Sequence, residues 1–294
     1  MIVVTAPTGQ IGSRTLERLV AAGARVRVIV RDASRLRASV REAVEVVEGS
    51  HGDVDVLMKA FAGAESVFWL APPNPRAESV EDAYSGFSRP AAQALAAQGV
   101  QRVVAVSVLG RGTPMAENAG YITASLAMDD LLISSGVGYR ALAMPSFMEN
   151  VLRQTDLIRD QGVITSPIAG GRRMPFCAVR DIAAAAAELL LDGTWSGVEE
   201  VPLLGAEDLS FEDMAQIMSE VLERPVRFRQ VSGEEFTARM TRSGASAAMA
   251  RGALDMAIAK EAGMDNAVPR TVRTTTPTSF RQWCQEVLKP AVLG

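Results

Sequence analysis

Residues 2–31 read IVVTAPTGQIGSRTLERLVAAGARVRVIVR. An apolar run opens this stretch, a turn containing Gly9 and Gly12 follows, and a helix-like segment then continues to Gly23. A second apolar run ends at Arg31. The pattern predicts a strand, a glycine turn, a helix and a second strand within about 30 residues, which is typical of a unit that binds a dinucleotide.

The two glycines of the turn have a physical use. Lacking side chains, they let the backbone approach a pyrophosphate, and the following helix offers free N–H groups and the positive end of its dipole. The pattern is A-x-x-G-x-x-G, so Ala6 stands where a first glycine is usual and carries a Cβ in a tight turn. The alternative is a doubly wound domain whose glycines only turn the chain.

The residue that ends the second strand selects the cofactor. A carboxylate there accepts a hydrogen bond from the ribose 2′-hydroxyl of NAD, whereas an arginine suits the 2′-phosphate of NADP. Arg31 holds this position, Asp32 competes with it, and Arg35 and Arg37 lie just beyond. Side chains alternate along a strand, so only one of Arg31 and Asp32 faces the ribose. We expect NADP(H); the alternative is a solvated basic start of a helix.

Composition limits the function classes. The chain has 294 residues, 48% of them hydrophobic, and a net charge of −4, which gives material for a large core and no sign of a basic nucleic-acid footprint. Two cysteines, Cys177 and Cys284, imply no disulfide framework, and Cys177 is expected to be a buried small hydrophobe. The single histidine, His51, is expected in an exposed loop, so no metal site and no Ser-His-Asp triad are predicted.

The chain also lacks the marks of export or membrane insertion. The first strand begins at the start of the sequence and leaves no room for a signal peptide. The longest apolar run, residues 182–191, falls short of the ~20 residues that span a bilayer. We expect a cytoplasmic protein, a monomer or homodimer, with no nucleic-acid or membrane partner.

Strand and helix signals alternate through the first half of the chain. The expected strands are residues 2–4, 26–30, 44–48, 65–70, 102–108 and 139–144, and the helices between them include 54–61, 79–98 and 119–135. This predicts an α/β fold: a Rossmann-type doubly wound parallel sheet over residues 1–145, with the ligand crevice at the carboxyl ends of its strands.

After Pro145 the pattern changes. Residues 146–294 are expected to form a smaller C-terminal α+β substrate lobe that covers the crevice, with some elements returning to the main sheet. Its expected helices are 147–160, 234–266, 280–287 and two that begin at the N-caps Asp181 and Ser210, and its expected strands are 163–168, 201–204 and 226–231.

Six segments resemble the NmrA-like group of atypical short-chain dehydrogenases, and together they span nearly the whole chain. They are TAPTGQIG (5–12), VIVRD (28–32), VVAVS (103–107), AMPSFMENVL (143–152), VRDIA (179–183) and TPTSFRQW (276–283). The PSFMEN segment is the most specific and has Met144 where the family usually has arginine. The family includes NADP-dependent reductases of quinones, dyes and imines, and also redox sensors that bind the dinucleotide without turnover.

The resemblance implies a set of cofactor-binding residues. Thr8, Gly9, Gln10, Ile11 and Gly12 correspond to the pyrophosphate turn, with Arg14 near it, and Arg31 and Arg35 to the 2′-phosphate site. It also places Asp53 and Val54 beside adenine, Ala71 and Pro72 beside the adenosine ribose, Ser107 and Val108 near the nicotinamide, and Pro145, Ser146 and Phe147 on its other side.

Classical members of the wider superfamily use Tyr-x-x-x-Lys, in which the lysine lowers the pKa of the proton-donating tyrosine. None of the three lysines here follows a tyrosine at that spacing, and Ser125 stands four residues after Tyr121. This argues against alcohol dehydrogenase and sugar epimerase chemistry. It favours hydride transfer to acceptors that need little acid catalysis: quinones, imines, azo or triarylmethane dyes, and activated alkenes.

Tyr121 and, more weakly, Ser107 are the candidate catalytic residues; the alternatives are packing for Tyr121 and a local hydrogen bond for Ser107. Tyr121, Phe147, Met148 and Phe176 are candidates for the wall around a small hydrophobic or aromatic substrate, although ordinary core positions explain them equally well. The sequence therefore predicts an NADPH-dependent reductase, with a non-catalytic NADP sensor acting through a protein partner as the alternative.

Overall fold

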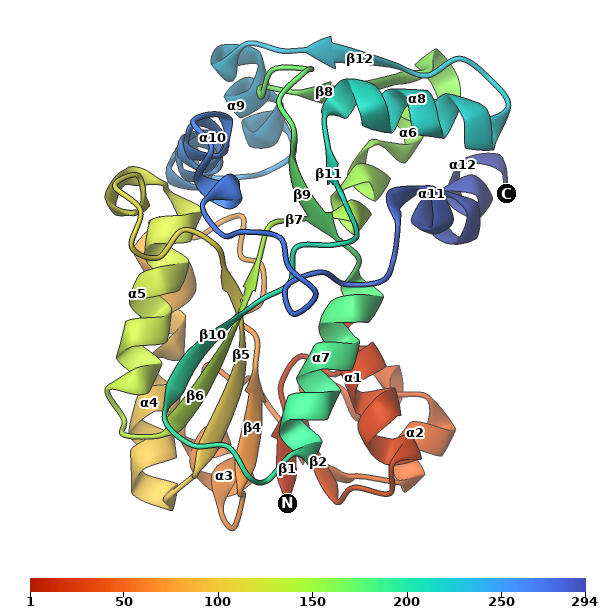
Figure 1. Cartoon of the computed structure of the whole chain (residues 1–294). Helices are drawn as coiled ribbons and strands as arrows, with labels where there is room; N and C mark the ends of the chain where they lie inside the picture. The colour runs from red at the N-terminus through yellow and green to blue at the C-terminus, as the bar shows by residue number, and fades with distance from the viewer.

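The computed structural model describes residues 1–294 and contains a seven-stranded, fully parallel sheet in the order β10-β6-β5-β4-β1-β2-β3 (Figure 1). Its strands are β1 (Ile2–Val4), β2 (Val26–Val30), β3 (Glu45–Glu48), β4 (Ser66–Trp69), β5 (Arg102–Val108), β6 (Gly138–Met144) and β10 (Val198–Pro202). The six strands predicted in the first half are all present. The strand order reverses between β1 and β4, the place where doubly wound sheets bind their ligands.

Helices cover both faces of this sheet. α1 (Gln10–Ala21) and α7 (Val179–Leu191) pack on one face, and α3 (Val54–Phe61), α4 (Phe87–Gln98) and α5 (Tyr121–Ile133) pack on the other (Figure 1). The strands are apolar on both faces, so each face buries its own core of valines, leucines and isoleucines. Short helices η1 (Ala33–Arg35), α2 (Ala38–Glu42), η2 (Asp82–Gly86) and η3 (Ala116–Asn118) complete this half.

The second half builds a separate layer beyond the carboxyl edge of the sheet (Figure 1). Two small sheets, β11-β9-β7 and β12-β8, comprise β7 (Ser146–Phe147), β8 (Val163–Ser166), β9 (Met174–Cys177), β11 (Asp208–Leu209) and β12 (Arg227–Gln230). Their helices are η4 (Met148–Gln154), α6 (Thr155–Gln161), α8 (Phe211–Leu222), α9 (Gly233–Arg242), α10 (Ala247–Glu261), η5 (Met264–Asn266), α11 (Phe280–Trp283), η6 (Cys284–Leu288) and α12 (Lys289–Leu293).

Two elements of the second half pack with the first half. β10 pairs in parallel with β6, and α7 packs against α1, although both follow residue 145 in the chain. The division into residues 1–145 and 146–294 stays a prediction, since these two elements belong spatially to the first half. None of the helices combines the length and apolarity needed to cross a bilayer.

Four of the predicted helices have a different form, and one of them, 280–287, changes from α11 to the π-helical turn η6 after Trp283. The stretch 147–160 starts with the strand β7, which pairs with β9, and continues as the 3₁₀ helix η4 before α6. The stretch 234–266 divides into α9 and α10 because Gly244 adopts φ +93° and Ser246 starts a new helix by capping Met249 N. The stretch 79–98 begins with the π-helical turn η2.

The two predicted N-caps have different outcomes. Ser210 caps α8 in a capping box with Asp213, as its spacing suggests. Asp181 does not cap α7, because Ala178 is the N-cap and Asp181 lies inside the first turn. Its buried carboxylate accepts instead from the backbone N–H and the hydroxyl of Thr278, which attaches the C-terminal segment to α7.

Candidate cofactor and acceptor site

In the glycine turn after β1, the backbone of Ala6 and the start of α1 lie very close together. Ala6 adopts φ +49°, a left-handed conformation that glycine accepts more readily than alanine. A Cβ added at Gly12 would clash with the backbone carbonyl of Ala6, and one at Gly9 would lie 3.3 Å from the same oxygen. Gly12 therefore lets α1 approach the turn, and no side chain fits there.

The start of α1 is left open to an anion. Its N-cap, Gly9, provides no side-chain cap, and no acidic residue lies in the first turn. Thr8, Gly9 and Gln10 are exposed, and Arg14 donates to the carbonyl oxygen of Gln10 at 2.9 Å on the same turn. Free N–H groups and the helix dipole fit the pyrophosphate of a dinucleotide.

Some of the charged side chains after β2 bond to other protein groups, and others have no partner. Asp32 caps η1: its carboxylate accepts from the backbone N–H of Ser34 at 2.9 Å and from the Ser34 hydroxyl at 2.6 Å, and these bonds lower its pKa. Arg37 pairs with Glu17. Arg31 and Arg35 are exposed and form no ion pair, so two guanidinium groups remain available at the end of β2.

The remaining predicted cofactor residues follow the strands of the same edge. Asp53 caps α3 through Asp55 N and Val56 N at 2.9 and 3.3 Å, and Val54 beside it is 40% exposed. Ala71 and Pro72 are half-buried in the loop after β4. Pro145 is buried after β6, and Phe147 is half-buried in β7. These positions meet at the carboxyl edge of the sheet, as predicted; which of them contact a ligand stays a prediction.

His51 lies in the loop between β3 and α3, as expected, but its side chain is half-buried, so the expected exposure is wrong. Its Nε2 lies 3.1 Å from the carbonyl oxygen of Leu70, and its ring packs edge-on against Trp69 and Phe87 with centroids 5.5 and 5.0 Å away. Burial lowers the pKa of His51 to about 4, so the ring is neutral at physiological pH. The residue joins the loop after β3 to the end of β4.

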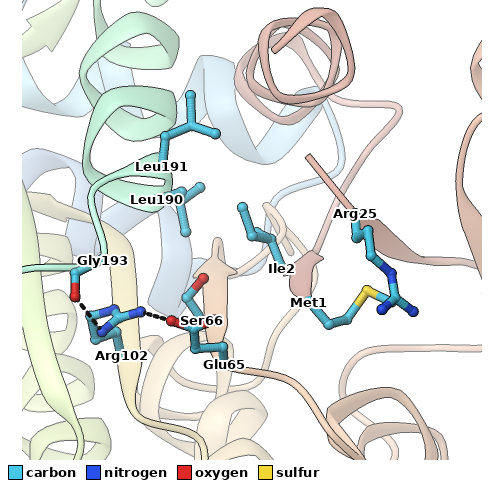
Figure 2. A pocket seen from close by; sticks show the side chains of 9 residues that line it. All are labelled: Met1, Ile2, Arg25, Glu65, Ser66, Arg102, Leu190, Leu191 and Gly193. Atoms are coloured by element: carbon cyan, nitrogen blue, oxygen red, sulfur yellow. Dashed lines mark hydrogen bonds and ion pairs between the residues drawn. The ribbon is translucent and has the colours of Figure 1, made fainter. Parts of the chain in front are cut away.

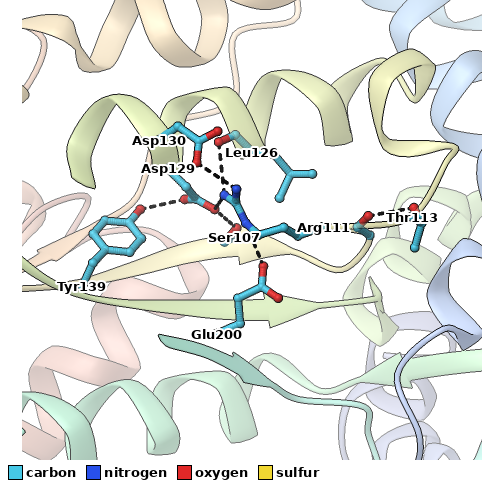
Figure 3. A network of polar contacts seen from close by, with 9 residues as sticks. Ser107, Arg111, Thr113, Leu126, Asp129, Asp130, Tyr139 and Glu200 are labelled. Carbon is cyan, nitrogen blue, oxygen red and sulfur yellow. Dashed lines mark hydrogen bonds and ion pairs between the residues drawn. The ribbon is translucent and has the colours of Figure 1, made fainter. Parts of the chain in front are cut away.

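Ser107 takes part in a buried polar network on α5 (Figure 3). Its hydroxyl donates to Asp129, whose other carboxylate oxygen accepts from the Tyr139 hydroxyl at 2.7 Å. Arg111 lies 3.8 Å from the Asp129 carboxylate and also pairs with Asp130 and Glu200. Burial raises the pKa of Asp129 to about 6. Ser107 lies near the carboxyl end of β5, but its hydroxyl is occupied by the hydrogen bond to Asp129 of α5.

Tyr121 stands at the start of α5, but its hydroxyl is engaged. It donates to the carbonyl oxygen of Met249 in α10 at 2.8 Å. Its ring lies beside that of Tyr84, with 6.2 Å between centroids. Tyr84 comes from η2, the segment that follows the loop after β4, and its hydroxyl forms no hydrogen bond. Sequence reasoning missed Tyr84 because it lies within a predicted helix and outside any motif.

The residues expected to line the substrate do not lie together in the structure. Met148 and Phe176 are 1% and 3% exposed and pack in the core of the second layer, whereas Phe147 is half-buried at its boundary with the sheet. Cys177 is fully buried, as predicted, and its burial raises the pKa of the thiol.

The turn between α9 and α10 joins the second layer to the loop after β4. Ser246 donates from its backbone N–H to Pro75 O at 2.8 Å and from its hydroxyl to Ala77 O at 2.6 Å. Nearby, a Cβ at Gly120 would clash with the backbone of Gly252, so α10 approaches the start of α5 closely. These contacts fix the α10 side of the candidate site.

A separate pocket of about 200 Å³ lies at the opposite, amino edge of the sheet (Figure 2). Arg102 crosses it, donating to Gly193 O at 3.0 Å and pairing with Glu65. Met1 and Ile2 at the start of β1 also line it, so it is far along the strands from the glycine turn. The glycine turn and the free arginines lie at the carboxyl edge, so this pocket is not part of the candidate site.

Comparison with known proteins identifies relatives with the same architecture. The chain matches the family described as NAD(P)H-binding over residues 7–192. It is 31% identical to a (4-alkanoyl-5-oxo-2,5-dihydrofuran-3-yl)methyl phosphate reductase of Streptomyces griseus, over 97% of both chains. It is 27% identical to an NAD(P)H azoreductase of Xenophilus azovorans, over 83% of this chain and 82% of the relative.

Solved structures share the fold at lower identity. The triphenylmethane reductase of Citrobacter sp., solved with NADP(H), superposes with a TM-score of 0.78 at 19% identity and covers 99% of this chain and 100% of its own. At that identity the likeness concerns the fold alone. It agrees with a parallel sheet and a covering layer that are both present in this chain.

Proposed function

This chain belongs to the NAD(P)H-binding family of reductase-type, NmrA-like proteins, and we propose that it is an NADPH-dependent reductase of a small, conjugated, largely apolar acceptor. The observation that carries the choice of NADPH is the arrangement after β2. Arg31 and Arg35 are unpaired, while the competing Asp32 is committed to Ser34. Guanidinium groups bind phosphate with two parallel hydrogen bonds, so the pair suits a 2′-phosphate.

Different residues at the carboxyl edge of the sheet bind different parts of the cofactor. The free N–H groups at the start of α1 bind the pyrophosphate, and Gly9 keeps the approach open. Asp53, Val54, Ala71 and Pro72 border the adenosine, and Pro145, Phe147 and the end of β5 border the nicotinamide. When bound, the cofactor supplies a hydride from its nicotinamide C4. The chain orients the acceptor against that face and excludes water around it.

The choice of acceptor follows from which groups the site lacks. Ser125 replaces the lysine of the Tyr-x-x-x-Lys pair, so no activated base is available to oxidise an alcohol. Acceptors that take hydride readily, such as quinones, azo dyes, imines and activated alkenes, need mainly positioning. The named substrates of the two relatives, an alkanoyl dihydrofuranone phosphate and azo compounds, fall within this range.

The test is cofactor oxidation with purified protein across a panel containing a quinone, an azo dye, a triarylmethane dye, a cyclic imine and an alkanoyl butenolide. We expect turnover with NADPH. In Arg31→Ala the Kd for NADPH should rise about 10- to 100-fold, since a hydrogen bond to a charged group contributes about 1.5–3 kcal/mol. The matched control is Arg37→Ala, because Arg37 already pairs with Glu17.

The outcomes separate the candidate functions. Tight NADPH binding without oxidation of any acceptor would favour a redox sensor that acts through a protein partner. A preference for NADH, or an Arg31→Ala protein that binds NADPH normally, would contradict the assignment of the 2′-phosphate site.

A further inference from the structure

Reduction of a quinone or a conjugated carbonyl needs a proton as well as a hydride. Apart from the Asp129 carboxyl, which is enclosed between the hydroxyls of Ser107 and Tyr139, the side chains that can supply one near neutral pH are three tyrosines, one histidine, two cysteines and three lysines. Their environments differ sharply, and a proton donor has to be free of partners within the protein and close to the ligand edge.

Two of the three tyrosines are engaged. The Tyr139 hydroxyl is buried and donates to Asp129 at 2.7 Å, and the Tyr121 hydroxyl donates to Met249 O at 2.8 Å. The histidine, His51, contacts Leu70 O and packs between two aromatic rings. Each of these groups already serves the packing of the protein.

The other candidates are engaged or distant. Lys260 is buried in an ion pair with Asp265, and Lys289 pairs with Glu223 near the C-terminus. Lys59 lies exposed in the last turn of α3, away from the carboxyl edge. Both cysteines are buried, and burial raises the pKa of each thiol.

Tyr84 is the exception. Its ring is largely buried against Tyr121 and the small apolar cluster around Met249, but its hydroxyl makes no hydrogen bond and its oxygen is not sealed from solvent. Burial raises the pKa of Tyr84 to about 12, so the proton is present at neutral pH. A half-buried phenol with a free O–H can donate to an oxyanion as it forms.

The backbone explains how this tyrosine reaches the site. η2 is a π-helical turn, and such turns insert one extra residue and recur at functional sites. It follows the loop containing Ala71 and Pro72, and it packs against the start of α5. Tyr84 therefore lies in the segment that joins the carboxyl end of β4 to α4, with its ring beside Tyr121 at the start of α5 and against the core on that face of the sheet.

We propose that Tyr84 is the proton donor of the reductase, and this proposal rests on the function proposed above. Hydride adds to the acceptor with two electrons, leaving negative charge on the acceptor oxygen. The Tyr84 O–H bond breaks, the proton moves to that oxygen, and the Tyr84 phenolate regains a proton from water. The balance is one NADPH and one proton consumed for each acceptor reduced. Tyr121 forms part of the wall that holds the Tyr84 ring.

The first experiment observes the contact without turnover. Protein labelled with ¹³Cζ-tyrosine gives three resonances, which Tyr→Phe variants at 84, 121 and 139 assign. With NADP⁺ bound, p-nitrophenolate serves as the oxyanion probe. We expect the Tyr84 resonance to move on addition of the probe while the Tyr139 resonance stays fixed. Movement of the Tyr121 resonance alone, or of none, would overturn the proposal.

The second experiment measures the step. With NADPH and the neutral quinone menadione, Tyr84→Phe should lower kcat by about 100-fold with KM within about threefold, the effect of removing a general acid. It should also lose the solvent deuterium isotope effect on kcat. Tyr139→Phe is the matched control, because the Tyr139 hydroxyl is buried and bonded to Asp129, and it should keep kcat within threefold. A Tyr84→Phe protein that is folded and as active as wild type would overturn the proposal.

The two proposals fail separately. If wild type fails to oxidise NADPH with every acceptor of the panel and the Tyr84 resonance does not move, both proposals are wrong. If wild type is inactive but the resonance moves, the reductase function is wrong and Tyr84 is no proton donor, although it still contacts an oxyanion in this site. If wild type is active but Tyr84→Phe is equally active, the reductase function stands and the Tyr84 proposal alone is wrong.

Discussion

The two sides of the candidate site use their polar groups in opposite ways. On the β1–β2 side, the start of α1, Arg31 and Arg35 carry positive charge with no protein partner. On the β5–α5 side, the hydroxyls of Ser107, Tyr121 and Tyr139 are all bonded within the protein. The first side is prepared for an anionic ligand, whereas the second is built mainly to hold its own helices in place.

The largest expected effect comes from the first side. Gly12→Ala places a Cβ against the Ala6 carbonyl at the point where α1 meets the turn. We expect loss of NADPH binding and a destabilisation of about 1–3 kcal/mol or more, as for overpacked cores. Thermal melting and fluorescence titration measure both. Ser13→Ala, one residue further along α1, is the control, and equal behaviour of the two variants would mean that the turn tolerates a side chain.

The next prediction concerns pH and the second side. The pKa of Asp129 is raised in the folded protein to about 6 from an ordinary 3.8, so the folded state binds more protons than the unfolded state between these values. The stability that Asp129 contributes is therefore present below about pH 4 and is lost as pH rises through 6. Asp129→Asn should remove this slope, which is at most about 1.4 kcal/mol per pH unit.

Denaturant unfolding of both proteins between pH 4 and pH 7.5 measures this difference. The slope is the difference between wild type and variant, because every other ionisable group of the protein is the same in both. If the free energy of unfolding depends on pH in the same way in both proteins, the buried Asp129 carboxyl does not take up a proton on folding.

Ser246→Ala examines how far the second side depends on its connection to the loop after β4. The change removes the hydrogen bond to Ala77 O and the N-cap of α10. We expect a loss of about 1 kcal/mol of stability, typical of a helix cap, with NADPH affinity nearly unchanged. A large loss of NADPH affinity would instead show that the two sides are coupled through this turn.

The smallest effect is expected for Asp32→Ala, which tests whether the Asp32 carboxylate contacts the ribose. If Asp32 only caps η1, Asp32→Ala should leave the Kd for NADH within about threefold, since no ribose bond is removed. Isothermal titration with NADH and NADPH measures both affinities. A selective loss of NADH binding would show that the Asp32 carboxylate faces the ribose.

The same contrast explains what the sequence could predict. Gly12 and Arg31 act through local backbone geometry within one strand–turn–helix–strand unit, so spacing alone located them. The parallel strands were recognised because each is an apolar run of ordinary length between turn residues. These features depend on neighbours that lie close along the chain.

Features that depend on distant segments were missed or misread. His51 was expected to be exposed, and only the packing of Trp69 and Phe87 buries it. Asp181 was expected to cap a helix, and its real partner, Thr278, lies almost one hundred residues away. The engagement of Tyr121 with Met249, which leaves Tyr84 as the free phenol, required the same long-range information. No local pattern encodes these contacts.

The return of β10 to the edge of β6 has a consequence for how the chain is made. As the polypeptide leaves the ribosome, β6 is complete at residue 144, but the strand that covers its edge ends only at residue 202. Until then the nascent sheet presents an open edge, which can pair with other chains. Slowed synthesis between these two points should therefore favour aggregation, and chaperones that shield strand edges should act in this interval.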